Sequence, residues 1–200
     1  KGYFYESTDQ YIKDLEINKV KDTVILIKGS SEFRFEEIGQ LLEAKTHETV
    51  LEINLNAISH NIKTYKSLLN PATKLLVMVK AFGYGAGIKE IGQILQRNNV
   101  DYLGVAYTDE GVDLRNEVID LPILVMNAER SSFNDIIKNE LEPSIFSFKQ
   151  IDSFIRKLID LGKKDYPINL KLDTGMNRLG FIEEEIDNII SIIMSQPEVR

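Results

Sequence analysis

The sequence contains no cysteine, which excludes a disulfide framework and every metal site built on thiolates. Its two histidines, His47 and His60, are too few and too isolated for a histidine metal cluster, so no metal centre is expected. No apolar run approaches the roughly 20 residues that span a bilayer. The first residues, KGYFYESTDQ, are unlike a signal peptide. These absences predict a cytoplasmic protein without membrane attachment.

The sequence also has fewer basic residues than acidic ones. Lysine and arginine number 24 against 31 acidic residues, a net charge of -7, and no long basic cluster occurs. This balance argues against nucleic acid or an anionic membrane as partner and favours a small-molecule ligand. With 200 residues, 43% hydrophobic and 28% charged, the chain has the composition of a soluble globular protein, long enough for one domain and part of another.

The first 45 residues predict a short α/β segment. The β-branched run from Val24 to Ile27 suits a strand buried on both faces, and a helix is expected near residues 35–42. The polar stretch EAKTHET then separates two patterned regions. We therefore predict a domain boundary there, with domains at residues 1–45 and 46–200.

After this boundary, strands and helices alternate. A short strand, VLEINL (50–55), leads to a helix for which Asn56 is the expected cap, and five strand–helix units follow. The expected strands are LLVMVK (75–80), YLGVAY (102–107), ILVMN (123–127), PSIFSF (143–148) and INLKLD (168–173), and the expected helices span 88–97, 109–117, 131–139, 149–161 and 183–194. This rhythm predicts a parallel sheet covered by helices, and both a doubly wound sheet and a (β/α)8 TIM barrel fit it. In a barrel, the domain is truncated after about five βα units.

A lysine ends the first of these strands, in VMVKAFGYGAG (77–87). The carboxyl ends of parallel strands are where such folds place reactive groups, and the amine of Lys80 can form a Schiff base with an aldehyde cofactor. The three glycines that follow would let the backbone approach a cofactor closely, and Tyr84 adds a hydroxyl to the same loop. The alternative is that Lys80 extends from the strand into solvent and the glycines form a flexible turn.

The fifth strand also ends in a charged, glycine-bearing loop, INLKLDTGMNRLGF (168–181). Alternation along a strand places Lys171 and Asp173 on the same face. If that face is a barrel interior, Lys171 must be paired, neutralised or chemically modified, because an isolated buried ammonium costs several kcal/mol. The alternative is a simple ion pair between Lys171 and Asp173 on an exposed strand edge.

VMVKAFGYGAG and LKLDTGMNRLGF resemble the two landmark motifs of the alanine racemase family, and EGVDLR and LPILVMN between them are also similar to it. The resemblance runs from about residue 47 to residue 200. It implies a homodimeric two-domain enzyme whose amino-terminal (β/α)8 barrel binds pyridoxal 5'-phosphate and which interconverts L- and D-alanine for peptidoglycan synthesis. It therefore favours the barrel over the doubly wound sheet.

By this resemblance, Lys80 is the lysine that binds the cofactor and one of two acid/base groups. Tyr84 lies near the cofactor, and Arg178 bonds the cofactor's phenolic oxygen. Lys171 is the position that many family members carry as a carbamate, and a carbamate would turn a buried cation into an anion able to hold Arg178.

The chain departs from the family at Phe82 and Ala86, where asparagine and histidine are more frequent. Both positions affect the packing of the loop rather than the lysine or the tyrosine. The family's second base is a tyrosine from the second domain of the partner subunit, and later barrel strands supply most phosphate contacts. Neither lies within these 200 residues, so we expect this chain alone to be inactive and a longer chain to racemise alanine.

The start of the chain resembles a different family. DTVILIKGS followed by an acidic helix is similar to the end of the ligase that adds D-alanyl-D-alanine to the muramyl tripeptide, although Ser31 stands where that family usually has arginine. Some bacteria fuse this ligase to alanine racemase in the same order. The resemblance implies a bifunctional parent whose ATP and magnesium sites lie outside this chain. A generic strand and turn before the barrel is the alternative.

Two other functions fit parts of the pattern. A non-catalytic barrel that binds pyridoxal phosphate also has a lysine at a strand end, but it would lack the DTGMNRLG loop, whose presence favours the racemase. The chain could also be a structural linker in a fusion protein. A cofactor adduct at Lys80 would separate the first two functions from the third.

Overall fold

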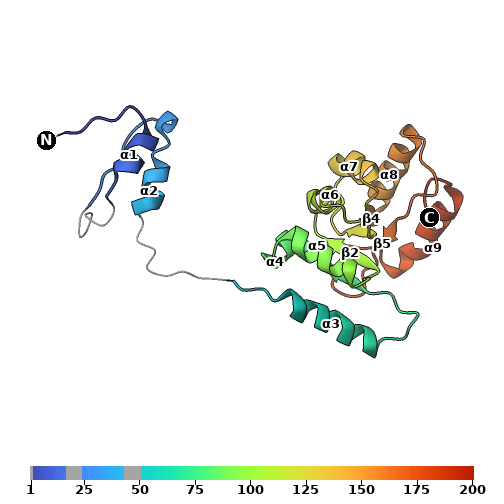
Figure 1. Cartoon of the computed structure of the whole chain (residues 1–200). Helices are drawn as coiled ribbons and strands as arrows, with labels where there is room; N and C mark the ends of the chain where they lie inside the picture. Colours follow the sequence, from blue (N-terminus) through green and yellow to red (C-terminus); the bar gives the residue numbers. More distant parts are fainter. Residues whose placement is uncertain (1, 17–23, 43–50) are drawn as a thin grey trace. The chain divides into compact units, whose positions relative to one another are not determined.

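The computed structural model describes residues 2–16, 24–42 and 51–200. The chain divides into two compact units, residues 1–52 and residues 53–200 (Figure 1). The predicted boundary between residues 45 and 46 falls outside the described residues, so the division there stays a prediction. Within the described parts, no helix is long and apolar enough to cross a membrane.

The first unit contains two short helices, α1 (Thr8–Asp14) and α2 (Glu36–Leu42), and a 3-10 turn, η2 (Ser31–Phe33). Helix α2 confirms the helix predicted near residues 35–42. The buried strand predicted at Val24 to Ile27 is wrong, because these residues have no regular structure and Val24 is 99% exposed. A strand needs a neighbour for its backbone hydrogen bonds, and the described residues of this unit include no other strand.

The second unit begins with helix α3 (Leu55–Leu68) rather than with a strand. The prediction of a strand over residues 50–55 is wrong for the described residues, and the cap is Asn54 instead of Asn56. The Asn54 side-chain oxygen accepts hydrogen bonds from the backbone N–H groups of Asn56 and Ala57, at 3.0 and 3.1 Å. These bonds satisfy two donors of the first turn and so begin the helix two residues earlier.

Five parallel strands follow, in the sheet order β1-β2-β3-β4-β5. They are β1 (Leu76–Met78), β2 (Tyr102–Val105), β3 (Ile123–Val125), β4 (Glu142–Ile145) and β5 (Asn169–Leu170). The helices of this part are α4 (Lys80–Tyr84), α5 (Ile88–Arg97), α6 (Thr108–Asn116), α7 (Phe133–Lys138), α8 (Phe148–Asp160) and α9 (Ile186–Ser195), with 3-10 turns η3 (Arg130–Ser132) and η4 (Glu183–Glu185). All five predicted strand–helix units are confirmed, with shorter strands than expected.

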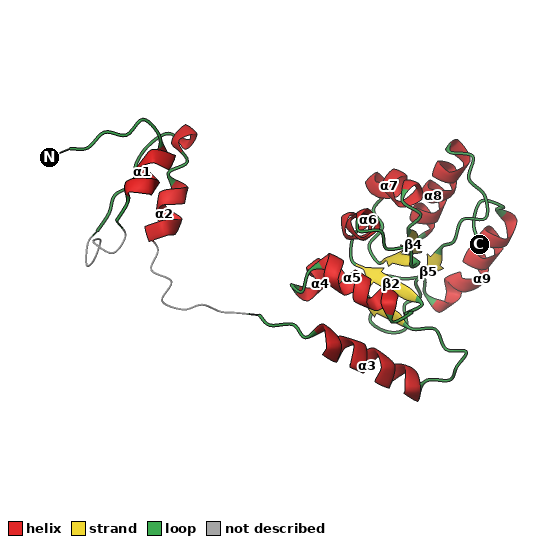
Figure 2. Ribbon diagram, viewed as in Figure 1, coloured by secondary structure: helices red, strands yellow, loops and turns green. Residues whose placement is uncertain are grey.

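The strand order distinguishes the two architectures that the sequence left open. A doubly wound sheet reverses its order at a switch point. Here each strand pairs with the next strand in the chain, and right-handed crossovers then put all the helices on one side of the sheet. Figure 2 shows helices α5 to α9 in an arc around the strands. The fold is α/β with a parallel, TIM-barrel-like sheet.

The two faces of the sheet differ. The face toward the helices is apolar and fully buried, with Leu103, Val105, Ile123, Val125 and Ile145 all at 0% exposure. The register places Met78, Gly104, Leu124 and Glu142 in one row on the opposite face, which we call the inner face. The helices therefore supply the hydrophobic core, and the inner face is available for polar groups.

Candidate active site

Lys80 lies directly after strand β1. The preceding residue, Val79, is fully buried, and its N–H donates to the carbonyl of Gly104 in β2 at 2.7 Å. The backbone is thus fixed on the neighbouring strand up to the residue before the lysine, whereas the Lys80 side chain is exposed. The amine stands at the carboxyl-terminal edge of the sheet, as the sequence predicted.

The short element α4 is not a regular right-handed helix, because its residues after Lys80 form a left-handed turn. The φ angles of Ala81, Phe82, Gly83 and Tyr84 are 52°, 52°, 64° and 59°, and the N–H of Gly85 donates to the carbonyl of Ala81 at 3.1 Å. Three of the four residues carry a Cβ, and each costs about 1–2 kcal/mol in this conformation. Such strain persists only where the surroundings fix it, and it is concentrated at functional sites. The sequence indicated flexibility from glycines, whereas the structure shows a strained turn built mostly from other residues.

The loop after β5 is organised by a carboxylate. Asp173 accepts hydrogen bonds from the backbone N–H groups of Gly175 and Asn177, both at 3.0 Å. The bonds from Asn177 and then Gly175 lower the pKa of the Asp173 carboxyl. The Lys171 N–H donates to Ile145 in β4 at 2.8 Å, which continues the sheet beyond the end of β5. Within the described residues Asp173 forms no ion pair with Lys171, so the simple ion-pair alternative for this loop is wrong.

Four predicted site residues share the same edge of the sheet. Lys80 and Tyr84 follow β1, and Lys171 and Arg178 follow β5, the strand at the other end of the sheet order. No hydrogen bond or ion pair joins these four side chains to one another or to another described residue. The edge therefore offers an amine, a phenol and two further cationic side chains with free donors. This donor set fits a cofactor that has an aldehyde, a phenolate and a phosphate.

The inner face carries a second polar group, which the sequence analysis missed. Glu142 is 9% exposed, and its two oxygens accept hydrogen bonds from the Tyr102 hydroxyl at 3.3 Å and the Asn169 amide at 2.9 Å. Burial, and then the charge of Glu142, raise the pKa of the Tyr102 phenol. Tyr102, Glu142 and Asn169 are each the first residue of a strand, so this group lies toward the amino-terminal end of the sheet.

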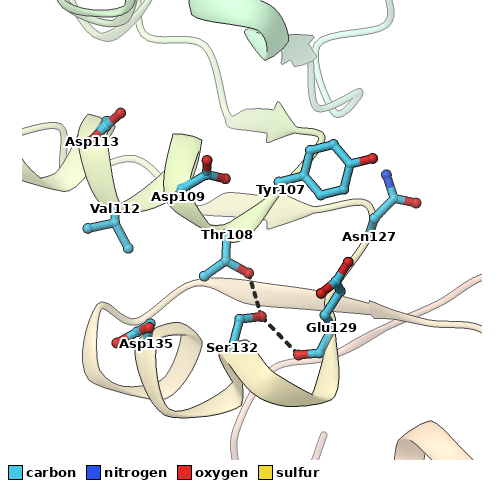
Figure 3. A pocket seen from close by; sticks show the side chains of 9 residues that line it. All are labelled: Tyr107, Thr108, Asp109, Val112, Asp113, Asn127, Glu129, Ser132 and Asp135. Carbon is cyan, nitrogen blue, oxygen red and sulfur yellow. Dashed lines mark hydrogen bonds between the residues drawn. The ribbon is translucent and has the colours of Figure 1, made fainter.

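A hollow of about 650 Å³ lies where β2 and β3 lead into α6 and α7 (Figure 3). The Thr108 and Ser132 hydroxyls are hydrogen-bonded to each other at 2.8 Å, and Ser132 also donates to the Glu129 carbonyl at 2.9 Å. Four carboxylates line the hollow: Asp109, Asp113, Glu129 and Asp135. Their negative charge disfavours an anion, so this hollow is unsuited to a phosphate group.

Another residue missed from the sequence is Glu110, whose carboxylate bonds the backbone next to Lys80. A glutamate three residues after the helix cap is half of the usual capping signal, although the cap here, Tyr107, is not one of the usual capping residues. That signal could have identified the bond to the cap. The bond to the loop after β1 is tertiary, and the local sequence contains no sign of it.

Comparison with known proteins gives a consistent result. Residues 53–200 match the family model described as alanine racemase, N-terminal domain. The chain is 34% identical over 152 residues to an alanine racemase of Synechocystis, which covers 75% of this chain and 41% of that protein. It is similar to the structure of alanine racemase from Clostridium difficile 630, with a TM-score of 0.70, 33% identity and coverage of 76% of this chain and 41% of that one.

A third match, with a TM-score of 0.65 and 24% identity, is an alanine racemase from Bartonella henselae with covalently bound pyridoxal phosphate; it covers 74% of this chain and 42% of that one. At this identity the likeness concerns the fold alone. The chain thus spans about two fifths of the length of these three relatives.

Proposed function

This chain belongs to the alanine racemase N-terminal domain family, and from that premise we propose that it is the pyridoxal-phosphate-binding part of an enzyme that interconverts L- and D-alanine. The observation that supports this most directly is the exposed amine of Lys80, directly before a strained turn at the carboxyl-terminal edge of a TIM-barrel-like sheet. The free donors of Tyr84, Lys171 and Arg178 at the same edge add to it.

Each of these residues has a role in the proposal. The Lys80 amine binds the cofactor and then takes or returns a proton at the substrate α-carbon on one face. Arg178 donates to the phenolic oxygen of the cofactor, and Tyr84 lies beside it. Pyridoxal phosphate, when bound, supplies the aldehyde for the amine and an electron sink for the charge left at the α-carbon.

Lys171 has a supporting role. We propose that its unprotonated amine adds carbon dioxide and releases a proton, which gives a carbamate. The anion would bond the Arg178 guanidinium and so orient it. Without this modification two cations would share the edge with Lys80, which repulsion disfavours.

The rest of the enzyme extends beyond these residues in the proposal. A tyrosine of the partner subunit's second domain serves as base on the other face, which requires a homodimer. The D-alanine supplies peptidoglycan synthesis in the cytoplasm. The KGS motif at Lys28 to Ser30 supports a fusion to the D-alanyl-D-alanine-adding ligase, with the ATP and magnesium sites in the ligase part, and assay of that ligase activity in the parent protein tests it.

Trapping with borohydride tests the central claim. The chain is incubated with pyridoxal phosphate, reduced, digested and mapped by mass spectrometry. We expect the main adduct at Lys80 and its loss in Lys80→Arg, whereas Lys138→Arg, a change at an exposed lysine of α7, leaves labelling unchanged. Labelling spread evenly over the exposed lysines would contradict the proposal.

Turnover separates the racemase from a cofactor-binding barrel. We expect no conversion of L- to D-alanine by this 200-residue chain and conversion by a longer chain that includes the second domain. An adduct at Lys80 without turnover in the longer chain would leave only the cofactor-binding function. Conversion by the 200-residue chain alone would refute the role of the partner's tyrosine.

A further inference from the structure

Glu110, in the first turn of α6, accepts three backbone hydrogen bonds. One oxygen, Oε1, accepts from the N–H of Ala81 at 2.6 Å. The other, Oε2, accepts from the N–H groups of Ala106 and Tyr107 at 2.7 and 3.2 Å. The bonds to Ala106 and Tyr107 are local to the start of α6, but the bond to Ala81 crosses to the residue directly after Lys80. One carboxylate therefore joins the ends of two strands.

The connection continues to a third strand. The carbonyl of Ala106, whose N–H donates to Glu110, accepts from the backbone N–H of Asn127 after β3 at 2.9 Å. The segments that follow β1, β2 and β3 are thus joined by hydrogen bonds centred on Glu110. A shift of this carboxylate would therefore move the backbone at the edge of the sheet where the proposed site lies.

The turn after Lys80 has few other anchors. Its internal bonds join Gly85 to Ala81 and Gly87 to Phe82, both at 3.1 Å, and Ala86 to Gly83 at 3.2 Å. The side chains of Phe82 and Tyr84 are 70% and 61% exposed, so they contribute little packing. Gly83 is buried, and a Cβ built there would lie 3.1 Å from Cγ1 of Ile91 in α5.

Among the hydrogen bonds of the described residues, Glu110 provides the only side-chain bond to residues 80–84. A strained left-handed turn needs such an external constraint, because each residue with a Cβ would otherwise relax to the right-handed or extended region.

We infer that Glu110 is a positioning residue, which holds the turn after Lys80 in its left-handed form and thereby fixes the backbone from which the cofactor-binding amine extends. This inference rests on the proposed function for the role of Lys80. A carboxylate suits the task because both of its oxygens only accept, so the two strand ends are bonded at once. A glutamine has one acceptor oxygen and could bond only one of them.

Hydrogen exchange tests the structural half without any cofactor. The amides of Gly85 and Gly87 are bonded within the turn and report its formation. In Glu110→Ala we expect their protection to fall about ten- to a hundredfold, the range for a lost bond to a charged group. Asp109→Asn is the matched control, because it removes the neighbouring charge of the same helical turn but no bond to the loop. Amides in the middle of α8 should keep their protection in both variants.

If Glu110→Ala fails to fold, Glu110→Leu replaces it, because leucine keeps much of the side-chain volume and has no acceptor for the Ala81 N–H. Unchanged protection at Gly85 and Gly87 in a folded Glu110 variant would overturn the inference. Equal loss in Asp109→Asn would also overturn it, because the effect would then be one of charge at the start of α6.

Cofactor binding tests the functional half. We expect the absorbance of the lysine-bound cofactor to appear about tenfold more slowly in the Glu110 variant than in the unaltered chain, and at the unaltered rate in Asp109→Asn. An unchanged rate despite lost protection would refute the positioning role. If the unaltered chain itself forms no adduct at Lys80, the proposed function fails, and the exchange result still decides whether Glu110 holds the turn.

Discussion

Replacing Gly180 by alanine tests how the loop after β5 is held. Gly180 has a φ of +133°, which residues with a side chain rarely adopt. A Cβ there would lie 2.5 Å from the backbone nitrogen of Asp173 and 2.6 Å from the carbonyl carbon of Leu172. Because both atoms belong to the backbone, no change of rotamer relieves the contact. The two sides of the loop must therefore move apart.

The expected cost follows from what this movement breaks. The Asp173 N–H donates to the Phe181 carbonyl and the Phe181 N–H to the Lys171 carbonyl, each at 2.9 Å. Two such bonds contribute about 1–3 kcal/mol, and the strained backbone adds about 1–3 kcal/mol. The free energy of unfolding should fall by about 2–6 kcal/mol, which corresponds to a fall in Tm on the order of 10 °C.

Urea unfolding followed by circular dichroism measures this loss. The matched control is Gly162→Ala, because Gly162 also has a positive φ, +63°, but a Cβ there meets nothing within 4 Å. The control should lose only about 1 kcal/mol, the cost of the left-handed conformation alone. Equal losses in the two variants would show that the backbone contact at Gly180 is not what holds the loop.

Two further predictions concern buried donors. The Arg115 guanidinium, whose pKa is lowered by burial, bonds backbone carbonyls of two segments, at Leu121 and at Asn139 and Glu140. A lysine cannot bond both segments at once, so Arg115→Lys should lower the free energy of unfolding in urea by about 1–3 kcal/mol. The control is Arg156→Lys, in an exposed ion pair, which should change the free energy of unfolding by less than about 0.5 kcal/mol. Similar losses in the two variants would refute the argument. Burial raises the pKa of the Tyr166 phenol, so as the pH rises the unfolded chain loses this proton before the folded chain does, near pH 10. The free energy of unfolding should therefore fall above that pH, by up to about 1.4 kcal/mol per pH unit. Tyr166→Phe should lessen this slope, measured as urea midpoints between about pH 9 and 11; equal slopes in both proteins would contradict the prediction.

The sequence predicted the amphipathic helices well. Helix α5 spans 88–97 in both prediction and structure, and α8 differs from its prediction by one residue at each end. In these segments apolar residues recur at helical spacing over three turns, so local pattern and burial agree. The predicted strand at Val24 to Ile27 failed because strand formation depends on a partner elsewhere in the chain, which composition does not reveal.

The site was predictable in part. A lysine at a strand end and a basic residue in a glycine-bearing loop are local features, and the motifs displayed both. The left-handed turn was not predictable, because Ala81 and Phe82 have no intrinsic preference for it. The bond from Glu110 that fixes Ala81 spans 29 residues of sequence. The strain and the bond that maintains it are tertiary properties, because the two segments meet only in the folded chain.

The polar groups of the sheet are divided between its two ends, and this division indicates where a ligand binds. Toward the amino-terminal end, both oxygens of the buried Glu142 accept hydrogen bonds from neighbouring side chains, so this carboxylate is partnered within the sheet and serves stability. At the carboxyl-terminal edge, Lys80 and Arg178 have no bonded partner among the described residues. An unpaired cation is tolerated at an edge that is exposed to solvent. Once a ligand excludes water from that edge, burying the charge becomes costly unless the ligand brings an anion. A phosphate-bearing cofactor meets this requirement, and the acidic hollow beside α6 and α7 does not compete for it. The stabilising end and the binding end of the sheet are thus separate, as in TIM-barrel enzymes generally.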